Sequence, residues 1–210
     1  MRCARVVSVN VGGPTRIGTR DGRPVGSGIV KTPVAGRVAV RGINVEGDMQ
    51  VDRRVHGGPD KAVYAYARED AAWWAGELAR ELPFGMFGEN LTTEGVDCSG
   101  AVLGERWRIG TVLLEVAQPR IPCFKLGLRF GDPGMVRAFA RASRPGAYLR
   151  IVEEGELGAG DPVELVERPD HGVTVALVSA ALVLDPSLRP RAAEAPQLPA
   201  QLRDLLRYGV

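Results

Sequence analysis

Short apolar runs, separated by segments that contain glycine and proline, constrain the fold of this chain more than any other feature. Its 210 residues include 27 glycines and 15 prolines, which predicts many turns and few long helices. Runs of strand length lie at residues 5–11, 36–43, 62–66 and 111–116. This spacing favours an all-β barrel or sandwich over about the first 165 residues.

Two helices are predicted to interrupt the strands. Residues 69–82 carry Ala71, Trp74, Leu78 and Leu82 at helical spacing. Asp132 and Pro133 suit the N-cap and first turn of a helix over residues 134–142. Residues 148–152 and 162–166 are predicted to form a final strand pair, joined by residues 155–161.

The character of the chain changes after Val166, and we place a domain boundary near Arg168. Residues 1–167 are predicted to form one β-rich domain, and residues 168–210 a short C-terminal extension. Within the extension, residues 173–184 have features of both strand and helix, residues 186–199 are rich in proline and alanine, and residues 202–206 suit a short helix.

Net charge, hydropathy and cysteine content indicate which partners and which cellular compartment to expect. With 27 basic and 25 acidic residues the net charge is only +2, which argues against a nucleic-acid partner. The longest nearly apolar run, residues 173–184, is shorter than the roughly 20 residues that span a bilayer. Three widely spaced cysteines are typical of a reducing compartment. We therefore expect a cytoplasmic protein that binds neither nucleic acid nor membranes.

Cys123 is the candidate reactive residue, in the Pro-Arg-x-Pro-Cys-Phe-Lys segment at residues 119–125. The prolines stiffen this segment and remove backbone donors. Arg120 and Lys125 flank the sulfur in sequence and would favour its thiolate, which binds metals or attacks electrophiles. The alternative is a buried, inert cysteine, which is our interpretation of Cys3 and Cys98.

Two polar, glycine-containing segments could border a ligand. In residues 47–61, adjacent glycines allow close backbone approach, and Arg53, Arg54 and Lys61 could hold an anionic group such as a phosphate. A solvated loop with a structural His56 is the alternative. In residues 84–92, Gly88 and Asn90 suit a tight turn before a strand, although the aromatic start could wall a planar ligand. The chain has no dinucleotide, Walker, zinc-protease or nucleophile-elbow motif.

These segments, in this order, resemble the MOSC family, named for the C-terminal domain of molybdenum cofactor sulfurase, and most closely its YiiM-like bacterial branch. The similarity covers about residues 4–166. The combination of these segments is specific, although each segment alone would be weak evidence for the family. The tail after Arg168 matches the family poorly. The matching residues are Gly28 to Val34, Gly47 to Tyr66, Phe87 to Thr92, Gln118-Pro119-Arg120, Pro122-Cys123 and Lys125-Leu126.

The resemblance implies a MOSC-type β-barrel with a few helices and a partly helical C-terminal tail. It also implies molybdenum cofactor (Mo-molybdopterin), with Cys123 as the metal ligand, because a soft thiolate suits a metal already held by dithiolene sulfur. The cofactor-binding positions that it suggests are Arg53, His56, Lys61, Asn90, Arg120, Cys123 and Lys125.

The implied activity is reduction of a small N-hydroxylated substrate, of the hydroxylaminopurine or amidoxime type, by oxygen removal at molybdenum. Cys123 and His56 are the catalytic candidates, with His56 or water delivering the proton. Because the chain has no flavin motif or iron–sulfur cysteine set, electrons must come from a separate donor protein. A homodimer is left open.

Two other functions also remain open at this point. A cofactor or sulfur carrier would hold a persulfide on Cys123 without turnover. Alternatively, a MOSC scaffold could be repurposed for a metal-free reaction, because a fold does not fix a function.

Overall fold

Strands make up most of the first 167 residues, and helices make up most of the rest. The computed structural model describes residues 4–51 and 57–209. Its elements are β1 (Arg5–Val11), β2 (Thr15–Arg20), β3 (Arg23–Ser27), β4 (Thr32–Pro33), β5 (Arg37–Arg41), β6 (Asn44–Val45), η1 (Pro59–Lys61), β7 (Val63–Ala67), α1 (Arg68–Glu77), β8 (Leu91–Glu94), β9 (Arg106–Ile109), β10 (Val112–Pro119), α2 (Phe124–Phe130), α3 (Met135–Ala142), β11 (Ala147–Glu153), β12 (Gly155–Gly158), β13 (Val163–Glu167), α4 (Val175–Val183), η2 (Pro186–Leu188), α5 (Arg189–Ala192) and α6 (Ala200–Tyr208).

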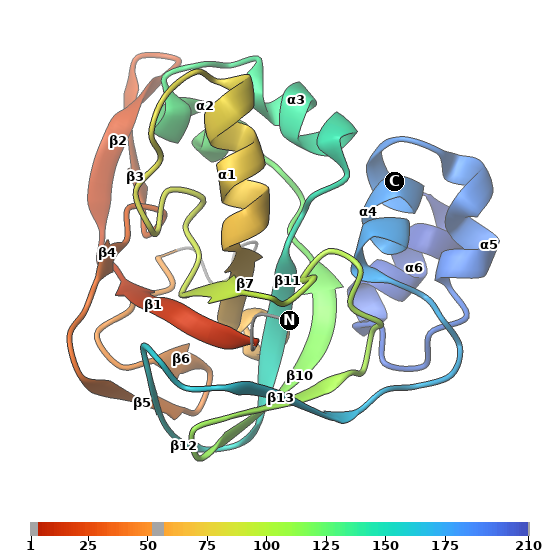
Figure 1. The fold of residues 1–210 in the computed structure, drawn as a ribbon. Helices are drawn as coiled ribbons and strands as arrows, with labels where there is room; N and C mark the ends of the chain where they lie inside the picture. Colours follow the sequence, from red (N-terminus) through yellow and green to blue (C-terminus); the bar gives the residue numbers. More distant parts are fainter. Residues whose placement is uncertain (1–3, 52–56, 210) are drawn as a thin grey trace.

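An eight-stranded sheet in the order β13-β9-β10-β11-β7-β8-β1-β4 forms the centre of the molecule (Figure 1). Its neighbours are antiparallel except β7 and β8, which run parallel because α1 connects them as a crossover. Strands β12, β5 and β6 form a second sheet, and β2 and β3 form a separate hairpin beside α2.

The closed barrel that the resemblance implies is wrong for the part of the chain that the structure describes. Strands β13 and β4 are the two ends of the large sheet and do not pair with each other. Strand β4 has only two residues and includes Pro33, which cannot donate a backbone hydrogen bond. Strand β13 is exposed and carries Glu164 and Glu167, charges that protect an edge from further pairing. The fold is mixed α/β, with the sheet predominating.

The predicted strands are confirmed in position, but the predicted final pair is wrong. Strand β1 has the predicted bounds, and β5, β7, β10, β11 and β13 overlap the other predicted runs. However, β11 pairs with β10 and β7, whereas β13 pairs with β9. The intervening segment forms a strand of its own, β12, which pairs with β5, so residues 155–161 are not a simple hairpin turn.

Both predicted helices are confirmed, with different ends. Helix α1 ends after Glu77, and Ala79 has a φ of 47°, a left-handed conformation that stops the helix before the predicted Leu82. Helix α3 begins at Met135 with Gly134 as its N-cap, so the predicted N-cap at Asp132 is wrong. Asp132 Oδ1 instead accepts a hydrogen bond of 2.7 Å from the Gly134 N–H, in the turn before the helix. The apolar segment with mixed signals becomes helix α4, capped by Thr174, whose Oγ1 accepts from the Leu177 N–H.

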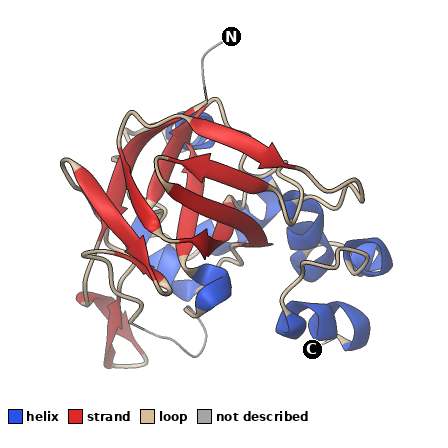
Figure 2. Cartoon of the chain, turned by 90° about the horizontal axis from the view of Figure 1, so that it is seen from below, coloured by secondary structure: helices blue, strands red, loops and turns tan. Residues whose placement is uncertain are grey.

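The C-terminal helices lie to one side of the strands and share their core (Figure 2). Val175, Val178 and Ala181 of α4 belong to the same buried cluster as Leu114 and Val116 of β10. The boundary near Arg168 therefore does not coincide with a break in the hydrophobic core. No helix within residues 4–51 and 57–209 is long and apolar enough to cross a membrane.

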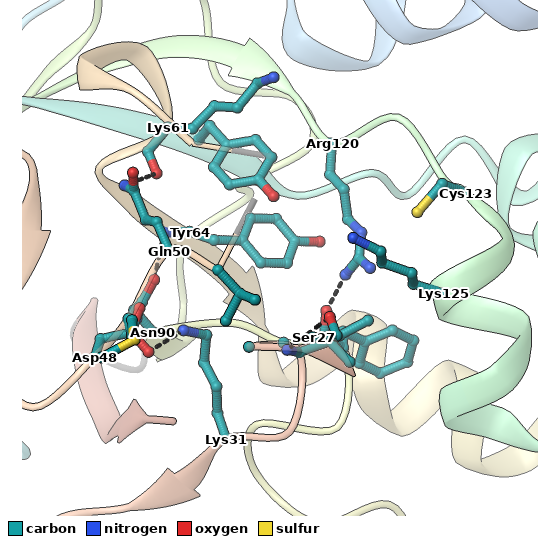
Figure 3. A pocket seen from close by; sticks show the side chains of 17 residues that line it. Ser27, Lys31, Asp48, Gln50, Lys61, Tyr64, Asn90, Arg120, Cys123 and Lys125 are labelled. Carbon is teal, nitrogen blue, oxygen red and sulfur yellow. Dashed lines mark hydrogen bonds and ion pairs between the residues drawn. The ribbon is translucent and has the colours of Figure 1, made fainter. Parts of the chain in front are cut away.

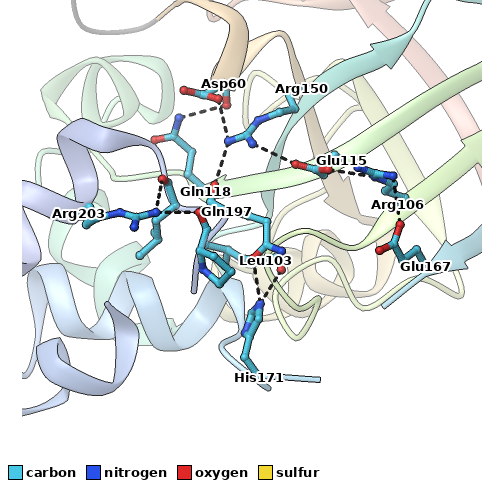
Figure 4. Close-up of polar contacts among 12 residues, drawn as sticks. Asp60, Leu103, Arg106, Glu115, Gln118, Arg150, Glu167, His171, Gln197 and Arg203 are labelled. Atoms are coloured by element: carbon cyan, nitrogen blue, oxygen red, sulfur yellow. Dashed lines mark hydrogen bonds and ion pairs between the residues drawn. The ribbon is translucent and has the colours of Figure 1, made fainter. Parts of the chain in front are cut away.

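A polar network also fixes the C-terminal segment to the sheet (Figure 4). His171 Nδ1 accepts from the Val173 N–H at 3.0 Å, which places the ring proton on Nε2. Nε2 lies 3.1 Å from the Leu103 carbonyl oxygen and 3.2 Å from Gln197 Oε1. Arg150 of β11 donates to the Gln197 carbonyl oxygen at 3.0 Å.

Candidate functional site

One pocket brings together residues that are far apart in the sequence (Figure 3). Its walls come from the end of β3 and the segment after it, the loop after β6, η1, β7, the turn before β8, the segment before α2 with the first turn of α2, and β11. The cavity is about 90 Å³ and is open to solvent. The lining residues are Ser27, Gly28, Ile29, Lys31, Asp48, Met49, Gln50, Val51, Lys61, Tyr64, Phe87, Gly88, Asn90, Arg120, Cys123, Lys125 and Tyr148.

Cys123 lies at the N-terminal end of α2 and carries a half-buried thiol. Its backbone is extended, with φ −133° and ψ 172°, and its carbonyl accepts from the Leu126 N–H at 2.9 Å. Figure 3 shows its sulfur directed toward the side chains of Arg120 and Lys125. A helix N-terminus and neighbouring cations both favour a thiolate over a thiol.

Arg120 is a buried cation in the pocket wall, with 7% of its surface exposed. It donates to the Phe87 carbonyl oxygen, and its guanidinium carbon lies 5.4 Å from the centroid of the Tyr64 ring. Burial by itself lowers the pKa of Arg120. Tyr64, Tyr148 and Cys123 raise that pKa by a larger amount, so the net shift is upward. Arg120 therefore remains charged beside the sulfur.

A buried ion pair joins Lys31 and Asp48, which the sequence analysis did not select as site residues. Asp48 also accepts from the Gly12 N–H at 2.9 Å and from Asn90 Nδ2 at 3.0 Å. Burial lowers the pKa of Lys31, and the charge of Asp48 partly opposes this. Both residues fall within the segments that carry the resemblance, but no spacing rule indicates that they meet.

Asn90 uses its amide to hold the pocket wall together. Its Oδ1 accepts from the Tyr64 N–H at 3.1 Å, and its Nδ2 donates to the Asn10 carbonyl oxygen and to Asp48. These contacts use both donor hydrogens of Nδ2. Asn90 therefore shapes the pocket, and only one lone pair of Oδ1 remains for a ligand.

Glu89 fixes the turn before β8 from inside the protein. The carboxylate is 2% exposed and accepts from the Gly85 N–H at 2.6 Å, the Phe87 N–H at 3.0 Å and Thr92 Oγ1 at 3.0 Å. Gly88 has a φ of 78°, and a Cβ there would lie 2.8 Å from Ile29 Cγ1. This predicted turn therefore requires glycine, and it places Asn90 in the pocket.

The pocket includes most of the site residues predicted from the sequence. Lys61, Asn90, Arg120, Cys123 and Lys125 all line it. Arg53 and His56 lie outside the residues that the structure describes. Gln50, Tyr64 and Tyr148 also line the pocket and, like Lys31 and Asp48, were not predicted from the sequence as site residues.

The other described cysteine is far less accessible. Cys98 is fully buried, and its sulfur lies 3.3 Å from Thr93 Oγ1. Burial raises the pKa of Cys98 to about 12. The predicted buried position is confirmed for Cys98, whereas Cys3 lies outside the described residues.

The donor atoms of the pocket limit the kind of metal site that it could form. Within the described ranges, no group of three or more His, Cys, Asp or Glu side chains could hold a metal ion. A metal bound at Cys123 would therefore need to bring most of its ligands with it. A thiolate selects soft metals, and the surrounding lysines and Arg120 would attract an anionic ligand.

Comparisons with known proteins identify similar chains. The family model described as "MOSC domain" matches residues 52–164. The uncharacterized protein YflK of Bacillus subtilis is 38% identical over 170 residues, covering 81% of this chain and 76% of YflK. A Gibberella moniliformis protein named "Reductase" is 34% identical over 152 residues, which cover 70% of this chain but only 27% of that longer protein.

The structural similarity extends beyond the matched family region. The crystal structure of YiiM from Geobacillus stearothermophilus superposes with a TM-score of 0.78 at 32% sequence identity, covering 97% of each chain. Coverage of this extent includes most of the segment after Arg168. The C-terminal helices, whose sequence matches poorly, therefore have counterparts in YiiM.

Proposed function

This chain belongs to the MOSC domain family, and from that membership we propose that it is a reductase of N-hydroxylated compounds that binds molybdenum cofactor through Cys123. The observation that carries the proposal is a half-buried thiol in a pocket that Lys31, Lys61, Arg120 and Lys125 also line. The name of the Gibberella relative supports a reductase.

The residues of the pocket suit the cofactor in charge and in donor chemistry. The dithiolene of molybdopterin would supply two sulfur ligands, and Cys123, which lines the pocket, would supply one more. The phosphate of the cofactor would be held by basic side chains, for which Arg120, Lys61 and Lys125 are the candidates. A cavity of about 90 Å³ would take only one end of such a ligand, so the rest would lie in its opening.

When bound, the cofactor would supply the two electrons that break the N–O bond of the substrate. The protein would contribute position and electrostatics. Arg120 would hold its positive charge beside the Cys123 sulfur, and the Asn90 amide would keep Asp48 and Tyr64 in place. The aromatic rings beneath the pocket, among them Tyr64 and Phe87, would restrict water. The proton would come from water or from His56.

Electrons would come from another protein in this proposal. The sequence has no flavin motif or iron–sulfur cysteine set. The Gibberella reductase is much longer than its matching region, since the match spans 27% of it. Because this sequence carries neither kind of redox motif, the proposal assigns electron delivery to a separate donor protein.

The test is reduction of 6-hydroxylaminopurine by the purified holoprotein with a chemical reductant. We expect turnover in the wild type and in Cys98→Ala, and no turnover in Cys123→Ala. Cys98 is the matched control because it is a thiol outside the pocket. Full activity in Cys123→Ala, or equal activity in protein without cofactor, would contradict the proposal.

A further inference from the structure

Positive charge is concentrated on two segments that border the pocket on the side of Cys123. Residues 15–27 and 120–144 contain nine basic and two acidic residues, a net charge of +7. The whole chain has a net charge of +2, so the remainder is net negative by five charges. Such an asymmetric distribution orients a protein during encounters with a charged partner.

The two segments are packed against each other beside Cys123. The Arg20 guanidinium of β2 lies 4.3 Å from the centroid of the Phe124 ring, and Phe124 directly follows Cys123. A Cβ at Gly18 would lie 3.3 Å from Leu128 Cδ2 of α2. Figure 1 shows the β2–β3 hairpin beside α2, on the opposite side of the molecule from α4, α5 and α6.

The hairpin tip carries two arginines that oppose each other. Arg20 and Arg23 are direct cross-strand partners, an arrangement in which like charges are destabilising. Asp21 lies 3.7 Å from Arg20, but their side chains are 90% and 58% exposed, respectively, so this pair contributes little. A carboxylate on a partner protein would relieve the repulsion.

Apolar side chains are exposed on either side of Cys123, and one of them, Phe124, contacts Arg20. Ile121 and Phe124 are 37% and 36% exposed, and both lie within two residues of Cys123. A small apolar centre with charged surroundings is typical of transient protein contacts, and redox encounters have the smallest interfaces.

We propose that Arg20, Arg23, Ile121 and Phe124 form the docking surface for a small, acidic electron-transfer protein. The proposal rests on the reductase function, which needs electrons from outside the chain. Arginine suits this role because its planar guanidinium pairs with carboxylates in two-point contacts. Docking here would bring the donor to the side of the pocket that holds Cys123.

A reduced flavin in the partner gives up two electrons, singly or together, and becomes oxidised. The substrate takes these two electrons and two protons from water, its N–O bond breaks, and R–NHOH becomes R–NH2 and H2O.

The experiment uses the holoprotein, with reduced flavodoxin as the acidic probe and reduced methyl viologen as a small cationic reductant. The charge-reversal variant Arg20→Glu/Arg23→Glu should lower kcat/KM for flavodoxin roughly tenfold or more. Because added salt screens charges, it should also lower kcat/KM of the wild type for flavodoxin. Arg20→Lys/Arg23→Lys should retain most of the activity, and methyl viologen should support equal turnover in every variant.

The matched control is Arg41→Glu/Arg207→Glu, which makes the same charge change at two exposed arginines on β5 and α6. It should leave the flavodoxin reaction nearly unchanged. Equal losses in both charge-reversal variants, or no loss at Arg20 and Arg23, would overturn the docking surface. The proposal would also be overturned if the wild type turned over substrate with methyl viologen but not with flavodoxin.

Binding of oxidised flavodoxin, measured by titration calorimetry, tests the surface without turnover. If the wild type does not reduce the substrate with methyl viologen, the reductase function is wrong. The docking surface is then judged by flavodoxin binding alone. Binding lost only in Arg20→Glu/Arg23→Glu would support it, and absent or unchanged binding would contradict it. Arg20- and Arg23-dependent binding to phosphatidylserine vesicles, without flavodoxin binding, would assign the face to a membrane and overturn the proposal.

Discussion

Lys31 and Asp48 form an ion pair in which both side chains are buried, 8% and 5% exposed. Removing one partner would leave a buried charge without its counterion. We expect Lys31→Met to lower the free energy of unfolding by about 3 kcal/mol. The double variant Lys31→Met/Asp48→Asn should recover most of that loss, because it buries no charge.

Denaturant unfolding of the wild type, both single variants and the double variant provides this measurement. A large positive coupling between the two sites is the expected result. If Lys31→Met is as stable as the wild type, or if the double variant is no more stable than that single variant, the pair does not contribute as described.

Cys98 and Cys123 should differ sharply in reactivity. Because burial raises the pKa of Cys98 to about 12, its thiol stays protonated as the pH rises from 7 to 9, and no water reaches it. In native protein, iodoacetamide should therefore modify Cys123 but not Cys98 across this range. Peptide mass spectrometry assigns the label to each cysteine. Labelling of Cys98 before unfolding would contradict its placement in the core.

At the scale of the elements, Arg150 of β11 joins three parts of the chain (Figure 4). It lies 2.8 Å from Asp60 Oδ1 of η1, 3.0 Å from Glu115 Oε1 of β10, and 3.0 Å from the Gln197 carbonyl oxygen. Gln118 also donates to the Asp60 carbonyl oxygen at 3.1 Å. The turn that carries Lys61 is therefore fixed to both the sheet and the C-terminal segment.

Arg150→Met should lower the free energy of unfolding by about 2 kcal/mol, since hydrogen bonds between charged groups are lost. Hydrogen exchange should become faster in residues 57–61 and 186–199. Arg207→Met, at an exposed position of α6, should change neither quantity. Equal exchange in the two variants would show that Arg150 does not couple these segments.

The elements that the sequence predicted are those with a clear apolar pattern. Strand β1 carries four valines, of which Val6 and Val9 are fully buried, and was predicted with its observed bounds. The β2–β3 hairpin was missed because its residues are mostly exposed, with three arginines and little apolar alternation. Helix α2 was missed because it has only seven residues and directly follows Pro122 and Cys123.

The site was predictable where one segment carried several of its residues. Arg120, Cys123 and Lys125 are close in sequence, and the structure places them in the same pocket. Lys31 and Asp48 are 17 positions apart, and their meeting depends on the pairing of β4 with β1 and of β5 with β6. The barrel and the final strand pair were wrong because strand partners are decided by contacts distant in the sequence.

At the scale of the whole molecule, the C-terminal segment completes the hydrophobic core. Val173, Val175 and Val178, together with Leu202 and Leu206, lie in the same buried cluster as the sheet. Each such side chain contributes about 1.5–3 kcal/mol when it is fully buried. Together they are comparable with the whole stability of a typical domain, about 5–15 kcal/mol.

A chain truncated after Glu167 should therefore fail to fold cooperatively, although it ends at the predicted domain boundary. We expect it to be insoluble or to lack near-ultraviolet circular dichroism and a sharp thermal transition. A soluble fragment 1–167 with a cooperative transition would instead support an independent domain and contradict the importance of the shared core.

The central claim, that Cys123 binds molybdenum cofactor, is tested most directly by metal and pterin analysis. The wild type, Cys98→Ala and Cys123→Ala would be produced in a host that synthesises the cofactor and purified in parallel. We expect the wild type and Cys98→Ala to contain molybdenum and pterin, with near-equal amounts in the two proteins. Both should be absent from Cys123→Ala. Wild-type protein without molybdenum, or undiminished molybdenum in Cys123→Ala, would contradict the account.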